Sequence, residues 1–374
     1  MRILVFNAGS SSLKFELIEA GAGPQRRLAS GSFAATDGSG LFRWGGPGPA
    51  RPPVRSLADA ARSALDWLAE PAAHGEDLLP GLAASAHRIV HGGARFREPT
   101  RLGAAELGVL TQLSALAPLH NPPALSVIEA VRGRLGEALP AVGVFDTAYY
   151  ADLPEAAYRY AIPGEWFTRL GVRRYGFHGI AHAYLCQQVR LREANARRII
   201  SLQLGRGCSV TATRDGTPVA TSMGFTPLEG LVMGTRSGDV DAGALLYVME
   251  TEGLSPEAMR RALNERSGLL GVSGGSADMR ELLALEAKGD AAAALAVELF
   301  CRRARHYVGA YLAELDGAEA IVFGGGIGEN CPGVRERILS GCRRGAAPPA
   351  VHVVAVDEAA IIAAEAYAVL GAAA

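Results

Sequence analysis

The chain has 374 residues, of which 49% are apolar and 20% are charged, and its formal net charge is −1. This length predicts two domains of roughly 150–200 residues each. The nearly neutral charge argues against a protein that binds nucleic acid or a membrane by electrostatics. Because we find neither an apolar run near ~20 residues nor a charged-then-apolar leader, we expect no membrane span and no signal peptide. The five scattered cysteines indicate reduced thiols in a cytoplasmic protein.

The first fourteen residues predict a strand, a turn of small residues and a second strand. Residues 2–6 (RILVF) are short, apolar and rich in branched side chains, which is typical of a buried strand. The turn at residues 7–12 exposes backbone N–H groups and the hydroxyls of Ser10 and Ser12, and Lys14 adds a positive charge. We interpret this turn as a phosphate site, with an ordinary hairpin as the alternative.

The remainder of the first half alternates helices with strands. The stretch 36–54 is rich in Gly and Pro and predicts a surface loop. Helices are expected at 56–69, 104–116 and 122–134, and strands at 84–90 and 139–145. This alternation is typical of an α/β fold.

The second half repeats the pattern with which the chain begins. Residues 198–211 predict a strand, a turn and a strand, at an offset that matches Gly9 with Gly205 and Ser12 with Cys208. We interpret the repeat as a duplicated domain that holds phosphate between its two copies. Further strands are expected at 318–323 and 349–356, and helices at 239–252, 290–315 and 357–371.

Six segments concentrate Gly, His, Arg and Asp at places where strands should end. They are residues 7–14, 87–93, 118–122 with 145–147, 174–179, 222–241 and 323–330. Ligands of open α/β sheets bind beyond the carboxyl ends of the strands, so we expect these segments to converge. Phosphoryl transfer needs such cations and hydrogen-bond donors, because negative charge builds on the transferred group.

Each of these residues also has a structural interpretation. Arg88 alone would form a surface ion pair, Asp146 would cap a helix, and His178 would be a buried structural residue. The glycine run at 324–326 would be a tight turn. We assign His87, His91 and His182 to structure.

Eight motifs, in order, resemble the signatures of the acetate kinase family: NAGSSSLKFEL, HRIVHGG, APLHNPPAL, FDTAYY, RRYGFHGIAH, MGFTPLEGLVMGTRSGD, SGLLGVSGGSADMR and GGGIGEN. The resemblance covers essentially the whole chain. It implies an α/β fold of two duplicated actin-like (ribonuclease H-like) domains with an interdomain active-site cleft, as in the sugar kinase/Hsp70/actin superfamily. The N-terminal domain would be 1–147 plus 358–374, and the nucleotide-binding and dimerisation domain would be 148–357.

The resemblance also implies the roles of individual residues. The catalytic residues would be Arg88, Asp146, His178 and Arg236, with Asp146 orienting an arginine or a metal-bound water. The substrate-binding residues would be Arg88, Val90, Leu119, His120, Phe177 and Pro227. The nucleotide-binding residues would be Lys14, Ser10, Ser12, Gln203, Leu204, Gly205, Arg206, Gly207, Asp278, Met279, Arg280, Gly326, Ile327, Gly328, Glu329 and Asn330. Mg²⁺ or Mn²⁺ would bind Asn7 and Glu358.

The implied activity is reversible phosphoryl transfer from ATP to acetate, by direct in-line attack of the carboxylate, in a homodimer. Propionate or butyrate as the acceptor remains an alternative, and so does a non-catalytic, actin-like ATP-binding module. The family's second phosphate turn usually reads HLGNG, whereas residues 203–207 read QLGRG. Arg206 therefore leaves open another phosphoryl donor, such as pyrophosphate. Residues 179–182 read GIAH and lack two hydroxyls of the usual GTSH.

Overall fold

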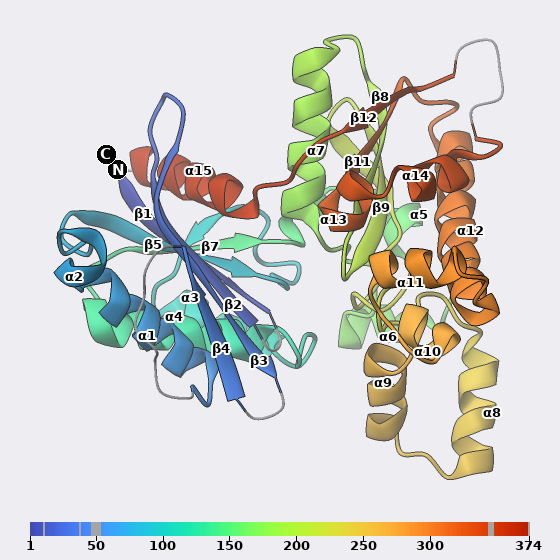
Figure 1. Cartoon of the computed structure of the whole chain (residues 1–374), viewed down its shortest axis with the longest axis horizontal. Coiled ribbons are helices and arrows are strands. Elements are labelled where there is room, and N and C mark those ends of the chain that lie inside the picture. The colour runs from blue at the N-terminus through green and yellow to red at the C-terminus, as the bar shows by residue number, and fades with distance from the viewer. Residues whose placement is uncertain (10–11, 37–38, 46–53, 343–347, 373–374) are drawn as a thin grey trace. The chain divides into compact units, whose positions relative to one another are not determined.

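The chain divides into two compact units, shown in Figure 1. The computed structural model describes all residues except 10–11, 37–38, 46–53, 343–347 and 373–374. Unit 1 comprises residues 1–151 and 357–374, and unit 2 comprises residues 152–356. The functions assigned from the sequence to the domains 1–147 plus 358–374 and 148–357 stay predictions. In the part of the chain that the structure describes, no helix has the length and apolar character needed to cross a membrane.

Unit 1 is built on a mixed sheet, which in the described residues has seven strands in the order β4-β3-β2-β1-β5-β7-β6. The strands are β1 (Arg2–Ala8), β2 (Ser12–Glu19), β3 (Arg26–Thr36), β4 (Ser39–Trp44), β5 (Leu82–Ile89), β6 (Thr100–Arg101) and β7 (Ala141–Phe145). Strands β1 to β4 form an antiparallel meander, whereas β1, β5 and β7 run parallel. The carboxyl ends of these three parallel strands therefore point to one edge of the sheet.

Helices cover both faces of this sheet. On one face, Leu4 and Phe6 of β1 join a core with apolar residues of α1 (Leu57–Leu68) and α4 (Asn121–Leu135). The alternate residues Ile3 and Val5 are also buried, because successive side chains of a strand point to opposite faces. Helix α15 (Glu358–Gly371) packs against β1, β5 and β7 (Figure 1). The remaining helical segments of unit 1 are α2 (Pro71–His74), α3 (Ala104–Leu113) and the 3₁₀ turn η1 (Ala148–Tyr150).

Unit 2 repeats the central topology of unit 1. Its described residues form a five-stranded sheet in the order β10-β9-β8-β11-β12. The strands are β8 (Arg198–Leu204), β9 (Cys208–Arg214), β10 (Thr217–Thr221), β11 (Ala320–Gly324) and β12 (Ala350–Val353). Strands β8 to β10 are antiparallel, and β8, β11 and β12 are parallel, which is the pattern of β1, β2, β3, β5 and β7. This repeat confirms the predicted α/β fold class of two duplicated actin-like domains.

Most helices in the described residues belong to unit 2. They are α5 (Glu155–Tyr158), α6 (Gly164–Leu170), α7 (Gly179–Arg192), α8 (Ala242–Glu252), α9 (Pro256–Glu265), α10 (Gly268–Ser273), α11 (Met279–Glu286), α12 (Ala291–Glu314), α13 (Gly325–Asn330) and α14 (Pro332–Leu339). Helix α7 packs on β8 and β11, and α12 packs on β8 and β9. The five cysteines are all free thiols.

The surface loop predicted for residues 36–54 is wrong for residues 39–44, which form β4. Strand β4 pairs with β3, and aromatic side chains secure it in spite of the neighbouring glycines. The ring of Trp44 stacks on Phe42 with centroids 4.6 Å apart and on Trp67 of α1 with centroids 4.7 Å apart. Such stacked contacts add to the free energy gained by burying the rings. Residues 37–38 and 46–53 of the predicted loop lie outside the described residues.

Candidate active site

Arg88 and Asp146 form the centre of the polar cluster in unit 1. Arg88 lies near the end of β5, and Asp146 directly follows β7, the parallel neighbour of β5. The Nε and Nη2 atoms of Arg88 donate to Oδ1 and Oδ2 of Asp146 at 3.1 and 2.6 Å. The Asp146 side chain is only 2% exposed. Asp146 is therefore the partner of an arginine and not a helix cap, and Arg88 is not an isolated surface cation.

Asn7 and Glu358 complete this cluster. Asn7, near the end of β1, accepts a hydrogen bond from Nη1 of Arg88 at 3.0 Å and donates from Nδ2 to Glu358 Oε2 at 2.6 Å. Burial opposes the charged form of Arg88, but the carboxylates of Asp146 and Glu358 outweigh burial and raise the pKa of the guanidinium. Arg88 is therefore a permanent cation held on two sides.

The guanidinium of Arg88 retains two N–H groups beyond these contacts. A guanidinium carries five N–H donors, two on each terminal nitrogen and one on Nε. Among the described residues, Nε uses its one donor on Asp146, Nη2 uses one there, and Nη1 uses one on Asn7. One donor on each terminal nitrogen remains, and two such donors can bind the two oxygens of a carboxylate.

The predicted phosphate turn of unit 1 lies between β1 and β2. Gly9 N donates to Ser12 O at 2.8 Å, which closes the turn. Lys14 is exposed on β2, where its charge is accessible to an anion. Ser10 lies outside the described residues, and the nucleotide contacts of Ser12 and Lys14 stay predictions.

Three further residues of unit 1 were assigned to the acyl pocket. Val90 is buried just beyond β5, whereas the Leu119 side chain is 40% exposed. His120 precedes α4 as its N-cap residue, and no capping hydrogen bond comes from its side chain. The acyl-binding role of these residues stays a prediction.

Two buried histidines of unit 1 have contacts that suit the structural assignment. The His87 ring stacks on Phe6 and bonds to Ser85 Oγ at 3.0 Å. His91 Nδ1 accepts from Gly93 N at 2.9 Å. Burial lowers the pKa of His87 to about 3 and that of His91 to about 4, so both rings are neutral at physiological pH.

In unit 2, His178 lies at the end of a chain of hydrogen bonds. Its Nδ1 is 2.9 Å from Ser209 Oγ, and this hydroxyl is 2.7 Å from Nε2 of the buried His182. The His182 Nδ1 atom in turn lies 2.7 Å from Ser201 Oγ. Burial, together with the nearby His178, lowers the pKa of His182 well below its usual value. His182 is therefore a neutral ring that fixes Ser209, and Ser209 orients His178.

The backbone of His178 is strained. Its φ angle is +58°, and the residue immediately precedes α7. Residues other than glycine rarely adopt this left-handed backbone conformation, so contacts with the surrounding structure must maintain it at His178. His178 thus lies at the start of a helix and not at the end of a strand, contrary to our placement of segment 174–179.

The second phosphate turn lies between β8 and β9, next to His178 and Arg236. A Cβ atom on Gly207 would lie 3.3 Å from His178 Nε2 and 3.7 Å from Arg236 Nη1. The turn itself is closed by Gly205 N, which donates to Gly207 O at 3.0 Å. An imidazole, a guanidinium and a glycine turn therefore meet at one place in unit 2. The Arg206 side chain is exposed, and no hydrogen bond or ion pair of its guanidinium occurs within the described residues.

The segment 222–241 carries both Arg236 and Pro227. Nη1 of Arg236 donates to Pro227 O at 3.1 Å, so the guanidinium binds the backbone of its own segment. Gly234 N donates to Arg206 O at 3.2 Å, which joins this segment to the phosphate turn. Phe177, the other predicted acyl-pocket residue of unit 2, is buried beside His178 in the sequence.

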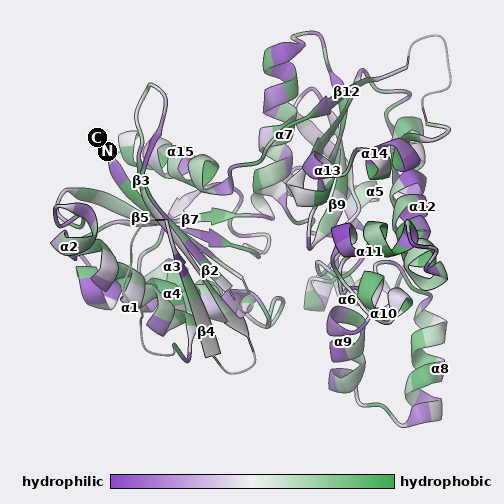
Figure 2. Ribbon diagram, in the orientation of Figure 1, coloured by the Kyte–Doolittle hydropathy of each residue, from purple (hydrophilic) through white to green (hydrophobic). Residues whose placement is uncertain are grey.

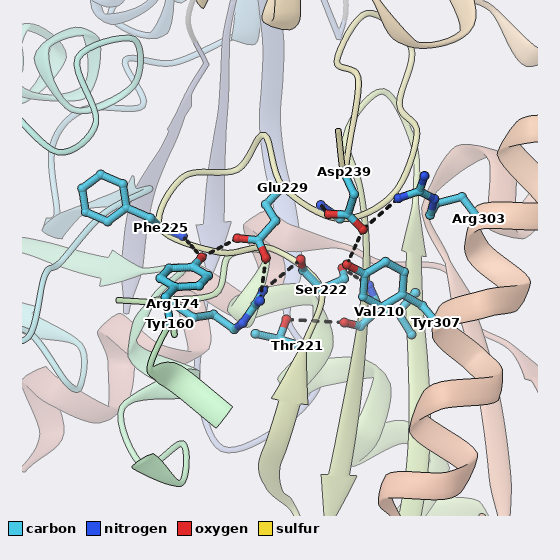
Figure 3. A network of polar contacts seen from close by, with 11 residues as sticks. Tyr160, Arg174, Val210, Thr221, Ser222, Phe225, Glu229, Asp239, Arg303 and Tyr307 are labelled. Atoms are coloured by element: carbon cyan, nitrogen blue, oxygen red, sulfur yellow. Dashed lines mark hydrogen bonds and ion pairs between the residues drawn. The ribbon is translucent and has the colours of Figure 1, made fainter. Parts of the chain in front are cut away.

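Three side chains that we call the Glu229 cluster (Tyr160, Arg174 and Glu229) fasten the start of this segment, as Figure 3 shows. The Tyr160 hydroxyl donates to Glu229 Oε2 and accepts from Phe225 N at 2.9 Å. Arg174 Nη2 donates to Glu229 Oε1 at 2.5 Å. A Cβ atom on Gly224 would collide with the Glu229 carboxylate and the Tyr160 hydroxyl. Only glycine therefore fits position 224 while the cluster is intact.

Asp239 fastens the other end of the segment. Its Oδ1 accepts from Gly230 N at 2.8 Å, and its Oδ2 accepts from Arg303 Nη1 at 2.9 Å and from the Tyr307 hydroxyl at 2.8 Å (Figure 3). Burial and the adjacent Asp239 carboxylate raise the pKa of Tyr307, so the phenol remains a donor. Helix α12, which carries Arg303 and Tyr307, is thus connected to the loop that holds Arg236.

The remaining predicted nucleotide segments are mostly engaged in local contacts. Glu329 Oε1 accepts from Gly325 N at 3.0 Å, and Asn330 Nδ2 donates to Gly326 O at 2.9 Å. Asp278 caps α11 and pairs with Arg280, whose hydrogen bonds lower the pKa of Asp278 to about 2. Gly326, Ile327 and Gly328 lie in α13, and Met279 is buried at the start of α11.

Within each unit, the structure brings together one group of the predicted residues. Two groups come together, Asn7, Arg88, Asp146 and Glu358 in unit 1, and Gly207, His178 and Arg236 in unit 2. Buried Gln203 Oε1 lacks a hydrogen-bond partner in the described residues. Our sequence analysis missed Ser209, the Glu229 cluster and Asp239. The run TPLEGLVMGTRSGD contains both Glu229 and Asp239, but the sequence alone did not identify the residues that bind these carboxylates.

A family model, curated relatives and solved structures each match this chain over most of its length. A family model described as the Acetokinase family matches residues 2–345. An acetate kinase from Solibacter usitatus is 44% identical over 356 residues, which cover 91% of this chain and 86% of the relative. The crystal structure of Porphyromonas gingivalis acetate kinase has a TM-score of 0.89 and 34% identity, with 99% of each chain covered. A propionate kinase from Francisella tularensis has a TM-score of 0.89 and 35% identity, with 97% of this chain and 98% of its own covered.

Proposed function

Because the chain belongs to the acetokinase family, we propose that it is an acetate kinase that transfers a phosphoryl group reversibly from ATP to acetate, giving acetyl phosphate and ADP. The observation that carries the assignment of the acceptor is the state of Arg88. Its guanidinium is mostly buried, permanently charged and held by Asp146 and Asn7, and two of its donors make no hydrogen bond to the described residues. Such a group suits a small carboxylate.

The proposed reaction requires no general base in the protein. Acetate is ionised at neutral pH, since carboxyl groups of this kind have pKa values near ~4. The difficulty is to bring an anionic carboxylate to an anionic phosphate. Arg88 would neutralise the carboxylate, and its two remaining donors would fix the direction in which a carboxylate oxygen attacks phosphorus.

In unit 2, His178 and Arg236 would stabilise the phosphoryl group during transfer. Negative charge on this group spreads over three equatorial oxygens, which need preorganised donors. The two side chains converge on the Gly207 turn, and the hydrogen-bond chain through Ser209 and His182 holds the His178 ring. Preorganised donors of this kind typically contribute several orders of magnitude to the rate.

The residues of unit 1 also fit a magnesium or manganese ion. Asn7 and Glu358 are in contact through Asn7 Nδ2 and Glu358 Oε2, and each side chain carries an oxygen of the kind that hard cations such as Mg²⁺ prefer as a ligand. Within the described residues, no group of three or more His, Cys, Asp or Glu side chains could hold a metal ion. A site with two protein ligands suits Mg²⁺, which usually keeps several waters. When bound, the ion would neutralise charge on the phosphates of ATP.

Propionate is the second candidate acceptor, because the Francisella tularensis neighbour is a propionate kinase. The decisive experiment measures kcat/KM for acetate, propionate and butyrate, each with ATP and with pyrophosphate. We expect ATP with acetate to be the best pair. A higher kcat/KM for propionate would overturn the choice of acceptor, and preference for pyrophosphate would overturn the choice of donor. Val90→Ala should raise the propionate-to-acetate ratio about tenfold, since it opens about a methylene's space.

We also propose that the protein is a homodimer through unit 2. Helix α8 supports this proposal, because it is rich in apolar residues and none of its residues is buried. Leu246 and Tyr247 are 60% and 68% exposed, and Figure 2 shows α8 as largely hydrophobic. A surface of this kind marks a protein interface. Light scattering should give a dimer mass for the wild type and a monomer for Leu246→Glu, and a monomeric wild type would contradict the proposal.

A further inference from the structure

Unit 2 contains a cavity of about 470 Å³ whose described lining residues do not include the Gly207 turn. It lies between α10 and α12 and the segment 222–241, and basic side chains dominate its polar lining. The polar lining residues are Ser237, Arg266, Ser267, Arg302, Arg303 and His306. None of the lining residues that the structure describes is acidic.

Most of these cations have no anionic partner. Among the described residues, Arg303 pairs with Asp239, whereas the side chains of Arg266, Arg302 and His306 form no ion pair or hydrogen bond. Arg266 and Arg302 add two positive charges that no carboxylate of the described residues balances, and an anion that enters the cavity would offset their repulsion. Guanidinium groups bind phosphate and carboxylate oxygens through paired N–H donors. The lining therefore favours a ligand with at least two negative charges.

The wall of this cavity is also the support of Arg236. Ser267 N donates to Thr235 O at 3.0 Å, and a Cβ on Gly268 would lie 2.6 Å from Arg236 O. The lining residue Ser237 directly follows Arg236 in the chain and donates from its N to Leu263 O at 3.1 Å. A displacement of this wall therefore shifts the backbone of Arg236.

Arg303 provides a second connection. Arg303 is one of the lining residues, and its guanidinium holds Asp239, which closes the loop from Gly230 to Asp239. A ligand anion would compete with Asp239 for Arg303. Because Arg236 lies in this loop, weaker attachment of Asp239 would make its position less defined.

We propose that the cavity is a regulatory site for a small oxyanion with two or more negative charges, either a phosphate ester or a polycarboxylate, and that its occupancy slows phosphoryl transfer. The binding is independent of the proposed function, but the effect on turnover rests on it. The site lies outside the acceptor-binding and phosphoryl-binding residues assigned above.

Binding is tested by isothermal titration of the full chain with glycerol 3-phosphate and, separately, with tricarballylate. The test variant is Arg302→Gln with His306→Gln, and the matched control is Arg260→Gln with Arg261→Gln, which removes two exposed arginines of α9. We expect at least one probe to bind the wild type and the control equally. Its Kd should rise at least about tenfold in the test variant, since a guanidinium and an imidazole that line the cavity are removed. Which probe binds distinguishes phosphate from carboxylate recognition.

The effect on turnover is measured with the probe that binds, at a constant concentration of free Mg²⁺. We expect kcat to fall in the wild type and the control but not in the test variant, with little change in either KM. If neither probe binds the wild type, or if one binds the test variant equally well, the proposed site is refuted. If binding passes this test but kcat does not respond, the regulatory role is refuted. A wild type without any acetate-dependent activity in the absence of probe would instead refute the proposed function.

Discussion

The substitution Asp146→Asn tests the role of the Arg88 guanidinium most directly. Asp146 accepts two of the three hydrogen bonds that Arg88 makes to the described residues, at 3.1 and 2.6 Å. Asparagine can accept only one of these two, and its amide N–H groups would face the N–H groups of the arginine. The variant therefore leaves a mostly buried cation without its counter-charge and without a fixed orientation.

The magnitude of this effect follows from the burial of the pair. Removing one partner of a buried ion pair costs ~3–5 kcal/mol, and we expect the lower end because the Arg88 side chain is 15% exposed. About 3 kcal/mol corresponds to a Tm roughly 6–12 °C lower for a unit of this size. Loss of one well-oriented, charge-assisted bond to the acceptor costs ~1.5–3 kcal/mol, which raises the KM for acetate about 10- to 150-fold.

The assay combines thermal unfolding with steady-state kinetics at varied acetate and at varied ATP. The KM for ATP should change much less than that for acetate, because Arg88 is assigned to the acceptor. Asp66→Asn is the matched control, since Asp66 forms a surface pair with Arg134 at 3.6 Å and such pairs contribute ~0–1 kcal/mol. If Asp146→Asn leaves the acetate KM and the Tm as unaffected as the control does, our account of Arg88 is wrong.

Four further predictions follow from other parts of the site. Arg236→Ala should lower kcat at least ~10²-fold with a smaller effect on the KM for ATP, and near-normal turnover would exclude its role in transfer. Arg206→Asn should raise the KM of the phosphoryl donor about tenfold or more at low salt and leave that of acetate unchanged, whereas identical salt curves for variant and wild type would make Arg206 irrelevant. Glu229→Gln should lower kcat about tenfold through the loosened segment 222–241, while Glu257→Gln on α9 should not, and equal rates for the two would contradict a positioning role. The free energy of unfolding should also decrease as the pH falls from 7 to 5.5. The buried histidines have pKa values in the folded state below the unfolded value near ~6.5, so the unfolded state binds more protons over this range. A free energy of unfolding in urea that does not change with pH over this range would contradict the low pKa values of His87, His91 and His182.

The central strands were predictable because their residues carry a local signal. Strands β1 and β8 are short apolar runs next to small-residue turns, and both faces of β1 are covered, which is why its run is continuous. Strand β3 reads RRLASGSFAAT and has no clear alternation, and β4 lies in a stretch rich in glycine. Their pairing depends on β2 and on the rings of Trp44 and Trp67, which are far apart in the sequence.

The candidate site was predictable by residue type but not by partner. Arg88 and Asp146 lie at the carboxyl ends of neighbouring parallel strands, beyond which open α/β sheets bind their ligands. The contacts of the Glu229 cluster join Tyr160 to a carboxylate 69 residues away, and no local pattern encodes such a pair. The same holds for Ser209, whose hydroxyl becomes informative only when β9 places it between His178 and His182.

The path of the chain through unit 1 has a consequence for how the protein is made. Asn7 and Glu358 are in direct contact but are separated by 351 positions, and the whole of unit 2 lies between them in the sequence. A ribosome therefore has to synthesise all of unit 2 before α15 can cover the face of β1 that carries Ile3 and Val5. Domains generally fold as they emerge, so most of unit 2 can fold while unit 1 still exposes this apolar surface. Strand β1 is thus synthesised first but is covered by α15 last, and chaperones have the most time to bind it.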